Sequence, residues 1–195
     1  DTGQIEAATP TPARSRWGTR LVLIAIVAFV ASPLVVAQLQ TVGVTWTPLG
    51  DWAHMVYRTS QVFTGNIPLV GAYTTKGWAH PGPLDFWLSA PLFQLSGRDP
   101  RALLWTAGVI NIASIAGLGA VAWRRGRWPW FLSVMALTAA LVHGFGPNYL
   151  SDIWNPFVPL LPFTLAVFLL YDAACGRKRA LIEATVAAWR ASEIT

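Results

Sequence analysis

The sequence predicts an all-α, polytopic membrane protein with about four transmembrane helices and further interfacial helices in its first outer loop. Charged residues make up 12% of the 195 residues and hydrophobic residues 54%, whereas an average soluble domain has about 25% charged residues. The chain also combines 11 Trp with 14 Pro. Trp is enriched at membrane interfaces, and Pro is more frequent in membrane helices than in soluble ones. This composition excludes a disordered chain and argues against a water-soluble domain.

Four apolar runs are long enough, or nearly so, to cross a bilayer, because about 30 Å of hydrocarbon takes about 20 helical residues. They cover residues 21–39, 102–123, 128–145 and 156–174. The first run follows Arg14, Arg16 and Arg20 and ends without a clear small-residue cleavage site. We therefore expect an uncleaved anchor there, with a cleaved signal peptide as the alternative.

The basic residues predict the orientation of these spans. They form short clusters in the N-terminal tail (1–20), at 124–127 and at the start of the C-terminal segment (176–195), and the net charge is +5. A nucleic-acid-binding protein gathers its basic residues on one face, so we expect no nucleic-acid partner. Four spans with a cytoplasmic N-terminus place all three clusters inside, as the positive-inside rule requires. The outer segments are then 40–101 and 146–155.

A further apolar run at 84–95 is expected to form an interfacial or re-entrant helix. It is short for a span and contains Asp85 and Pro91. Counting it as a crossing would also place the cluster 124–127 outside.

The first outer segment holds acidic and histidine side chains close together in sequence. Asp51 opens an amphipathic helix that is expected to end at Gly65. Asp51 is interpreted either as the N-cap of that helix or as a catalytic base at the membrane boundary. His54 follows one helical turn later. Together with His80, these residues are candidate ligands for a divalent cation such as zinc or manganese, the alternative being solvated loop histidines.

The second outer segment contains Asp152, which is a functional candidate because an ionisable residue at the end of a membrane helix is costly unless it is solvated or paired. The alternative is a cap of the fourth span, which Asn155 and Pro156 would begin. Arg58 and Lys76 are candidate phosphate ligands, or else contacts to lipid headgroups.

In their order, these features resemble the N-terminal module of the glycosyltransferase C (GT-C) superfamily, polytopic enzymes that include protein O-mannosyltransferases and aminoarabinose transferases. In the first outer segment the matching motifs are Asp51 to Tyr57, the run His80-Pro81-Gly82-Pro83-Leu84, and the run Pro91-Leu92-Phe93-Gln94-Leu95-Ser96-Gly97. In the second they are Pro147, Tyr149 and Asp152. The resemblance extends over about residues 15–175.

This resemblance implies a hexosyl- or pentosyltransferase of a bacterial plasma (inner) membrane, with its active face outside. It would transfer a sugar from a polyprenyl-phosphate donor to an acceptor. Asp51 would be the general base or bind a metal, and Asp152 would help to position the acceptor. The residues implied in substrate binding are Arg58, Lys76, His80, Asn148 and Tyr149. The prenyl tail would lie in an apolar groove beside the first two spans.

Members of this superfamily usually have several hundred residues and many more spans. We therefore expect the chain to be an N-terminal part, completed by missing downstream helices or by a partner subunit. The alternative is a noncatalytic integral membrane subunit or lipid-binding scaffold. A transporter ranks last, because the spans lack charges near their centres.

Overall fold

The computed structural model describes residues 14–73, 76–80, 82–154 and 156–192, and for 14–16 and 177–192 it describes the helical backbone alone. Within these ranges the chain is helical, without strands, which confirms the all-α class. Its longest elements are α1 (Arg14–Gln40), α4 (Arg101–Phe145) and α6 (Leu160–Ser192). The predicted N-terminal tail is mostly outside the described residues.

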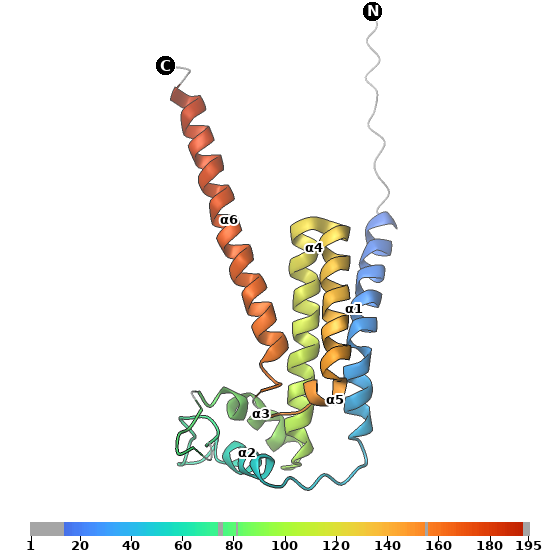
Figure 1. Cartoon of the computed structure of the whole chain (residues 1–195), viewed down its shortest axis with the longest axis vertical. Coiled ribbons are helices and arrows are strands. Elements are labelled where there is room, and N and C mark those ends of the chain that lie inside the picture. The colour runs from blue at the N-terminus through green and yellow to red at the C-terminus, as the bar shows by residue number, and fades with distance from the viewer. Residues whose placement is uncertain (1–13, 74–75, 81, 155, 193–195) are drawn as a thin grey trace, which may run out of the picture.

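The long element α4 is a helical hairpin rather than a single rod (Figure 1). Its backbone leaves helical geometry at Gly126 (φ −148°) and at Arg127 (φ 53°, ψ −137°). A Cβ atom at Gly126 would collide with the Trp130 indole, so this close approach requires glycine. The guanidinium carbon Cζ of Arg127 lies over the Trp123 ring, 5.2 Å from its centroid. The two arms on either side of this turn correspond to the predicted runs 102–123 and 128–145.

The hairpin determines which segments meet at each end of the molecule. In Figure 1 the start of α1, the turn of α4 and the far end of α6 point to one end. The short helices α2 (Asp51–Ser60), α3 (Leu84–Leu95) and α5 (Pro147–Leu150) gather at the opposite end. The two segments predicted to be outer therefore lie at the same end of the long helices. The predicted interfacial helix 84–95 has the same bounds as α3.

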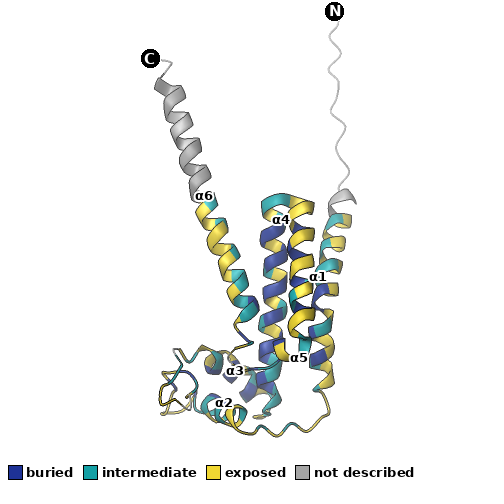
Figure 2. Cartoon of the chain, viewed as in Figure 1, coloured by how far each residue is buried: buried dark blue, intermediate teal, exposed yellow. Residues whose placement is uncertain are grey.

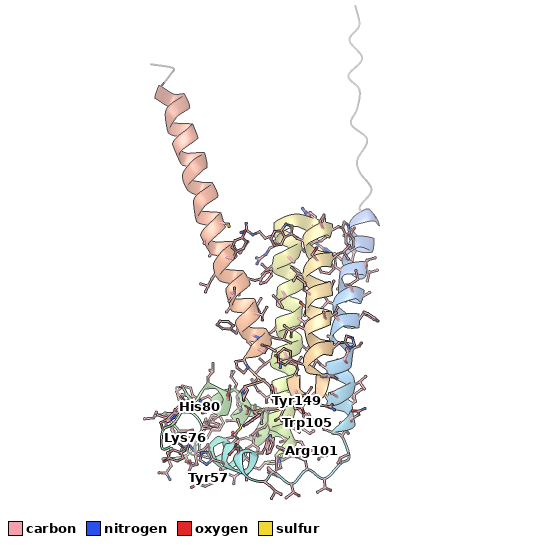
Figure 3. All side chains as sticks on the ribbon, in the orientation of Figure 1. Tyr57, Lys76, His80, Arg101, Trp105 and Tyr149 are labelled. Atoms are coloured by element: carbon pink, nitrogen blue, oxygen red, sulfur yellow. The ribbon has the colours of Figure 1, made fainter. Side chains whose placement is uncertain are left out.

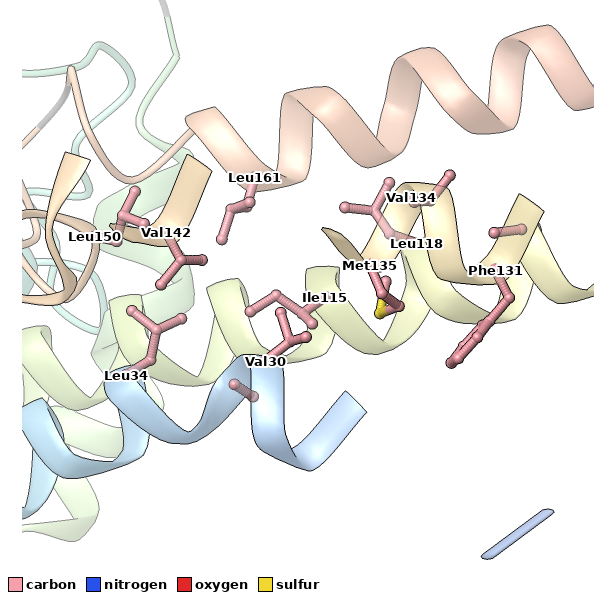
Figure 4. Close-up of a cluster of buried hydrophobic side chains, with 12 residues drawn as sticks. Val30, Leu34, Ile115, Leu118, Phe131, Val134, Met135, Val142, Leu150 and Leu161 are labelled. Carbon is pink, nitrogen blue, oxygen red and sulfur yellow. The ribbon is translucent and has the colours of Figure 1, made fainter. Parts of the chain in front are cut away.

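The long helices share a core between α1, both arms of α4 and the start of α6 (Figure 4). Leu34, Ile115, Phe131 and Leu161 are almost completely buried there. Small residues bring the helices together: a Cβ at Gly119 would lie 3.1 Å from Val27 Cγ2, and small residues allow close approach of helix backbones. The buried residues of α4 concentrate on its first arm (Figure 2).

The opposite faces of the long helices expose large apolar side chains. Phe29 of α1, Leu137 of α4 and Leu170 of α6 are each at least 70% exposed. A helix that is apolar on all sides is typical of a large protein core or of a membrane span. By length and composition, α1 and α4 are each sufficient to cross a membrane. The apolar part of α6, Leu160–Gly176, is shorter.

The predicted start of the fourth apolar helix is wrong. Residues 156–159 form turns, and α6 begins only at Leu160. The helix then continues through 176–192, so the described part of the predicted C-terminal segment is a continuation of α6.

The core predicts a contrast between two leucines of α1. Leu34 is completely buried, whereas Leu39 is 63% exposed. We expect Leu34→Ala to lower the free energy of unfolding by about 2–5 kcal/mol, because it leaves a cavity among packed side chains. Leu39→Ala, the matched control, should change it by less than about 0.5 kcal/mol. Thermal unfolding of the detergent-solubilised protein measures both, and equal losses would contradict this core.

Candidate functional site

A second apolar core positions the segments at the α2–α3 end of the molecule. Met55 of α2, Phe86 of α3, Leu103 of α4 and Ile153 are all buried in it. This core joins the two predicted outer segments to the first arm of α4. Because burial of apolar surface stabilises such contacts, the polar residues around the core are held by packed helices rather than by loops alone.

One hydrogen bond connects the two predicted outer segments directly. Trp52 of α2 donates from Nε1 to Asp152 Oδ1 at 2.8 Å, across 100 positions of sequence. The backbone N–H of Trp154 donates to the same carboxylate oxygen at 3.1 Å. The centroids of the Trp52 and Trp154 rings lie 6.4 Å apart. Asp152 is thereby fixed between two tryptophans by neutral donors.

A cavity of about 410 Å³ opens beside this hydrogen bond. It is formed by the end of α1, the segment leading into α2, the first arm of α4 and the segment around α5. Its lining residues are Ala37, Thr41, Trp46, Thr47, Pro48, Leu49, Trp52, Leu104, Asn148, Ser151 and Asp152. Asp152 is the one charged residue among them, so the lining carries a net negative charge when that carboxyl is ionised.

Polar atoms of the cavity lining lack partners in the described part of the chain. The Ser151 side chain is buried, with the residue 6% exposed, and its Oγ has no hydrogen-bond partner. Both hydrogen bonds to Asp152 go to Oδ1, which leaves Oδ2 without a donor among the described residues. An unsatisfied buried polar group costs about 1–3 kcal/mol. That cost applies to the Ser151 hydroxyl, whose oxygen is buried out of reach of the cavity space, whereas the Asp152 carboxylate is partly exposed.

The rim of the cavity is fixed by a structural ion pair. Arg101 pairs with Asp99 at 2.5 Å and donates to the carbonyl oxygens of Thr41 and Val44. Trp105 donates from Nε1 to Thr41 Oγ1 at 2.8 Å. Hydrogen bonding to Arg101 lowers the pKa of Asp99, so the pair stays ionised at neutral pH. Arg101 is thus engaged in holding the chain after α1.

The N-cap interpretation of Asp51 is wrong. The structure places Gly50 at the N-cap of α2, with φ 58° and no side-chain capping bond, and Asp51 is the first helical residue. A carboxylate in the first turn still interacts favourably with the helix dipole. Asp51 is exposed and does not line the cavity, although its neighbour Trp52 does.

The structure does not form the predicted metal site of Asp51, His54 and His80. Among the described residues, no group of three His, Cys, Asp or Glu side chains is placed to hold a metal ion. The His80 ring instead packs edge-on against Trp78, with centroids 4.8 Å apart. Its backbone pairs with Gly71 and Ala72. The structure therefore does not bring these three side chains together as one set of ligands.

The predicted substrate-binding residues do not all meet. In Figure 3, Lys76 and His80 lie in the loops beside α2 and α3, away from Tyr149. Arg58 donates to Gln61 Oε1 at 3.1 Å, and Tyr149 packs its ring 5.0 Å from Phe157. None of these four lines the cavity.

The predicted residues that do line the cavity are Asn148 and Asp152. Sequence reasoning missed Trp46, Trp52 and Ser151 as cavity residues. Both tryptophans stand close to the end of the first apolar run, where Trp is enriched at interfaces, and this placement was the available signal. No sequence pattern indicates Ser151, because it comes to line the cavity only where distant segments of the chain meet.

A second cavity of about 620 Å³ lies along the long helices between α1 and both arms of α4. All of its lining residues are apolar. They are Leu23, Ile24, Val27, Ala28, Ala31, Val35, Ile112, Ala116, Gly119, Ala120, Trp123 and Phe131. This apolar groove occupies the position beside the first two predicted spans.

Asp85 is a further carboxyl at this end of the molecule, in the first turn of α3. Burial raises its pKa. It does not line the polar cavity, so it is a suitable control for substitutions of Asp152.

No family model, curated protein or solved structure matches this chain.

The hydrogen bond between Trp52 and Asp152 predicts a specific loss of stability. Trp52→Phe keeps an aromatic ring but removes the indole donor, and we expect it to lower the free energy of unfolding by about 1 kcal/mol. In Trp154→Phe the backbone N–H still donates to Asp152, so that control should lose less. Thermal unfolding in detergent compares the two variants. A loss in Trp154→Phe that equals the loss in Trp52→Phe would show that the indole bond contributes nothing.

Proposed function

We propose that this chain is a four-span membrane module of GT-C type that takes part in sugar transfer from a polyprenyl-phosphate donor on the outer face of a bacterial plasma membrane. The observation that carries the proposal is the bond between Trp52 and Asp152. It lies beside a cavity between the two segments expected to be outer. The two segments that contain the superfamily motifs both contribute lining residues to that cavity, Trp52 from the first and Asp152 from the second.

The proposed spans are α1, the two arms of α4 and the apolar part of α6. They would place the basic residues at the turn of α4 on the side of the N-terminus, in agreement with the positive-inside rule. The exposed apolar faces of these helices would then contact lipid. The cavity would lie outside, at the membrane boundary.

The relative positions of the two cavities support a lipid-linked substrate. The apolar groove follows α1 from Leu23 to Val35, and the polar cavity begins at Ala37 of the same helix. On α4 the groove likewise begins at Ile112, and the cavity reaches Leu104. A molecule with an apolar tail in the groove could therefore present its polar end at the cavity. This is the arrangement that a polyprenyl-linked donor or a lipid acceptor requires.

In this proposal Asp152 binds the acceptor hydroxyl, because it lines the cavity and its Oδ2 has no donor within the described residues. The hydroxyl oxygen attacks the anomeric carbon of the sugar, and the bond between that carbon and the phosphate oxygen breaks, which releases the polyprenyl phosphate. A carboxylate receives the hydroxyl proton. Asp51, at the exposed start of α2, is the second candidate for that base. The phosphate would lie outside the cavity, since none of the described Arg and Lys residues lines it.

The second candidate function is a noncatalytic lipid-binding subunit. The same absence of Arg and Lys from the cavity lining favours it, because a phosphate leaving group needs positive charge to stabilise it. In that case the chain would hold the lipid, and a partner subunit would supply the cations.

The proposed topology predicts which introduced cysteines are accessible from each side. In a Cys175→Ser background, Leu69→Cys should react with a membrane-impermeant maleimide added to intact cells, and Arg124→Cys should react only after the membrane is opened. Both positions are exposed in the structure, so burial does not limit labelling. The reverse pattern would overturn the orientation.

The proposed reaction predicts that Asp152→Asn slows transfer. We expect membranes containing the chain to transfer radiolabelled sugar from a panel of polyprenyl-phosphate hexoses and pentoses, and Asp152→Asn to lower the rate by about 10²-fold or more, the usual effect of losing a general base. Asp51→Asn tests the second candidate base in parallel, and Asp85→Asn is the control.

Two results would contradict this reaction. Equal rates in wild type and in both the Asp51 and Asp152 variants would remove these carboxylates from the mechanism. The absence of any transfer above membranes lacking the chain would favour the lipid-binding subunit.

A further inference from the structure

We infer that the end of the apolar groove nearest the turn of α4 binds an anionic phospholipid, with its phosphate at Arg20 and Arg127 and an acyl chain in the groove. This inference goes beyond the proposed sugar transfer, because it concerns the end of the long helices opposite the polar cavity and a lipid other than the donor. It depends on unpaired positive charge, on the position of the groove and on the backbone of Arg127.

The first argument is the excess of positive charge at this end of the molecule. Arg125 pairs with Asp172 of α6 at 3.0 Å. Arg20, Arg124 and Arg127 are exposed and form no ion pair with another described residue. The other described carboxylates belong to the segments around α2, α3 and α5, at the opposite end (Figure 1). Basic residues between membrane helices attract anionic lipid headgroups, so this end favours a negatively charged lipid.

The second argument is that two of these arginines stand beside the apolar groove. Leu23 of α1 and Trp123 and Phe131 of α4 line the groove near the turn. The Cζ atom of Arg127 lies 5.2 Å from the centroid of the Trp123 ring. Arg20 precedes Leu23 by three residues, which places the two on one face of α1. Guanidinium groups match the geometry of a phosphate, and these two stand where a hydrocarbon chain in the groove would end.

The third argument is the backbone conformation of Arg127. Its φ of 53° lies in the region that glycine adopts readily and that a residue with a Cβ adopts at a cost. Non-glycine residues held in such conformations cluster at ligand-binding and active sites. A turn that served only to reverse the chain would be less strained with glycine at this position. A phosphate bound by the guanidinium gives a physical reason for arginine there.

The groove favours a lipid over a soluble phosphate. Its lining residues are apolar, and the burial of hydrocarbon adds affinity in proportion to the area removed from water. The acyl chains of phosphatidylcholine would fit the groove equally well, but its headgroup carries an ammonium that the arginines repel. Phosphatidylglycerol has a net negative charge and no ammonium. A donor tail that entered the groove from the polar cavity would compete with this lipid for the same space.

The test is native mass spectrometry of the full chain in detergent, which counts the lipid molecules bound to it. Phosphatidylglycerol is titrated at neutral pH, with phosphatidylcholine of the same acyl chains and soluble glycerol phosphate as comparisons. We expect saturable binding of phosphatidylglycerol, binding of phosphatidylcholine that is weaker by about fivefold or more, and no binding of glycerol phosphate. The absence of phosphatidylglycerol binding would overturn the inference, as would equal affinity for either comparison compound.

Two arginine variants with matched backbone changes locate the phosphate. Arg98, at the opposite end, is also exposed and has a φ of 67°, so Arg127→Gly and Arg98→Gly each remove one charge and one unfavourable φ. Arg127→Gly should weaken phosphatidylglycerol binding about fivefold or more without lowering the unfolding temperature, and Arg98→Gly should leave binding unchanged. Arg20→Gln, which relieves no strained backbone, should weaken binding as well. Equal binding in Arg127→Gly and Arg98→Gly, or unchanged binding in Arg20→Gln, would overturn the phosphate site.

Two alanines of the first arm of α4 locate the acyl chain. Ala120 and Ala113 are both exposed, but only Ala120 lines the groove. Ala120→Phe should weaken the binding of both phospholipids by filling the groove, and Ala113→Phe should not. Unchanged phosphatidylglycerol binding in Ala120→Phe, with thermal unfolding showing a folded variant, would overturn the groove as the acyl-chain site. Because no sugar donor or acceptor is present, a failed lipid-binding assay remains distinguishable from a failed transfer assay.

Discussion

The reversal of α4 at Gly126 and Arg127 is the constraint on which the rest of the structure depends. It turns one long apolar segment into two antiparallel arms, so that Arg101 and Phe145 come to the same end of the molecule. Without it, the segments 40–100 and 146–159 would lie at opposite ends of a rod. Glycine allows the close approach of Trp130, and Arg127 adopts a left-handed conformation that few non-glycine residues take.

The reversal alone does not place Asp152 precisely, and buried polar contacts complete the arrangement. Asn111, in the first arm of α4, donates from Nδ2 to the Leu150 carbonyl at 2.5 Å. This bond anchors the chain after α5 to the first arm, directly before Ser151 and Asp152. Trp52 then reaches the carboxylate from α2. The position of Asp152 thus depends on one contact from the first arm of α4 and another from α2.

Local features were predictable from the sequence where they depend on short-range pattern. The helix at 84–95, the start of a helix at Asp51 and the turn near 124–127 follow from hydrophobic runs and basic residues, and the structure contains all three. The late start of α6 was missed, because an apolar run that contains Pro156 and Pro159 does not reveal where helical hydrogen bonding begins. Gly50 as N-cap was missed because Asp51 is a stronger capping residue type.

The candidate site was less predictable, since its members are far apart in sequence. Asp152 and Asn148 were identified from one segment, but their contact with Trp52 spans 100 positions and leaves no trace in periodicity. Among the described residues, the structure does not bring together the three residues of the predicted metal site either. His54 and His80 are close to Asp51 in the chain, but His80 belongs to a loop whose backbone pairs with Gly71 and Ala72.

The distribution of charge around the cavity also constrains any reaction at this site. A departing polyprenyl phosphate needs positive charge close to its oxygens, and the cavity contributes a single carboxylate. Arg101 cannot supply that charge without giving up Asp99 and the carbonyl groups that hold the chain after α1. For the proposed transfer, the cations must therefore come from residues outside the lining or from a partner protein. In the proposed reaction, the cavity would therefore hold the hydroxyl-bearing acceptor, and the phosphate would lie beyond its rim.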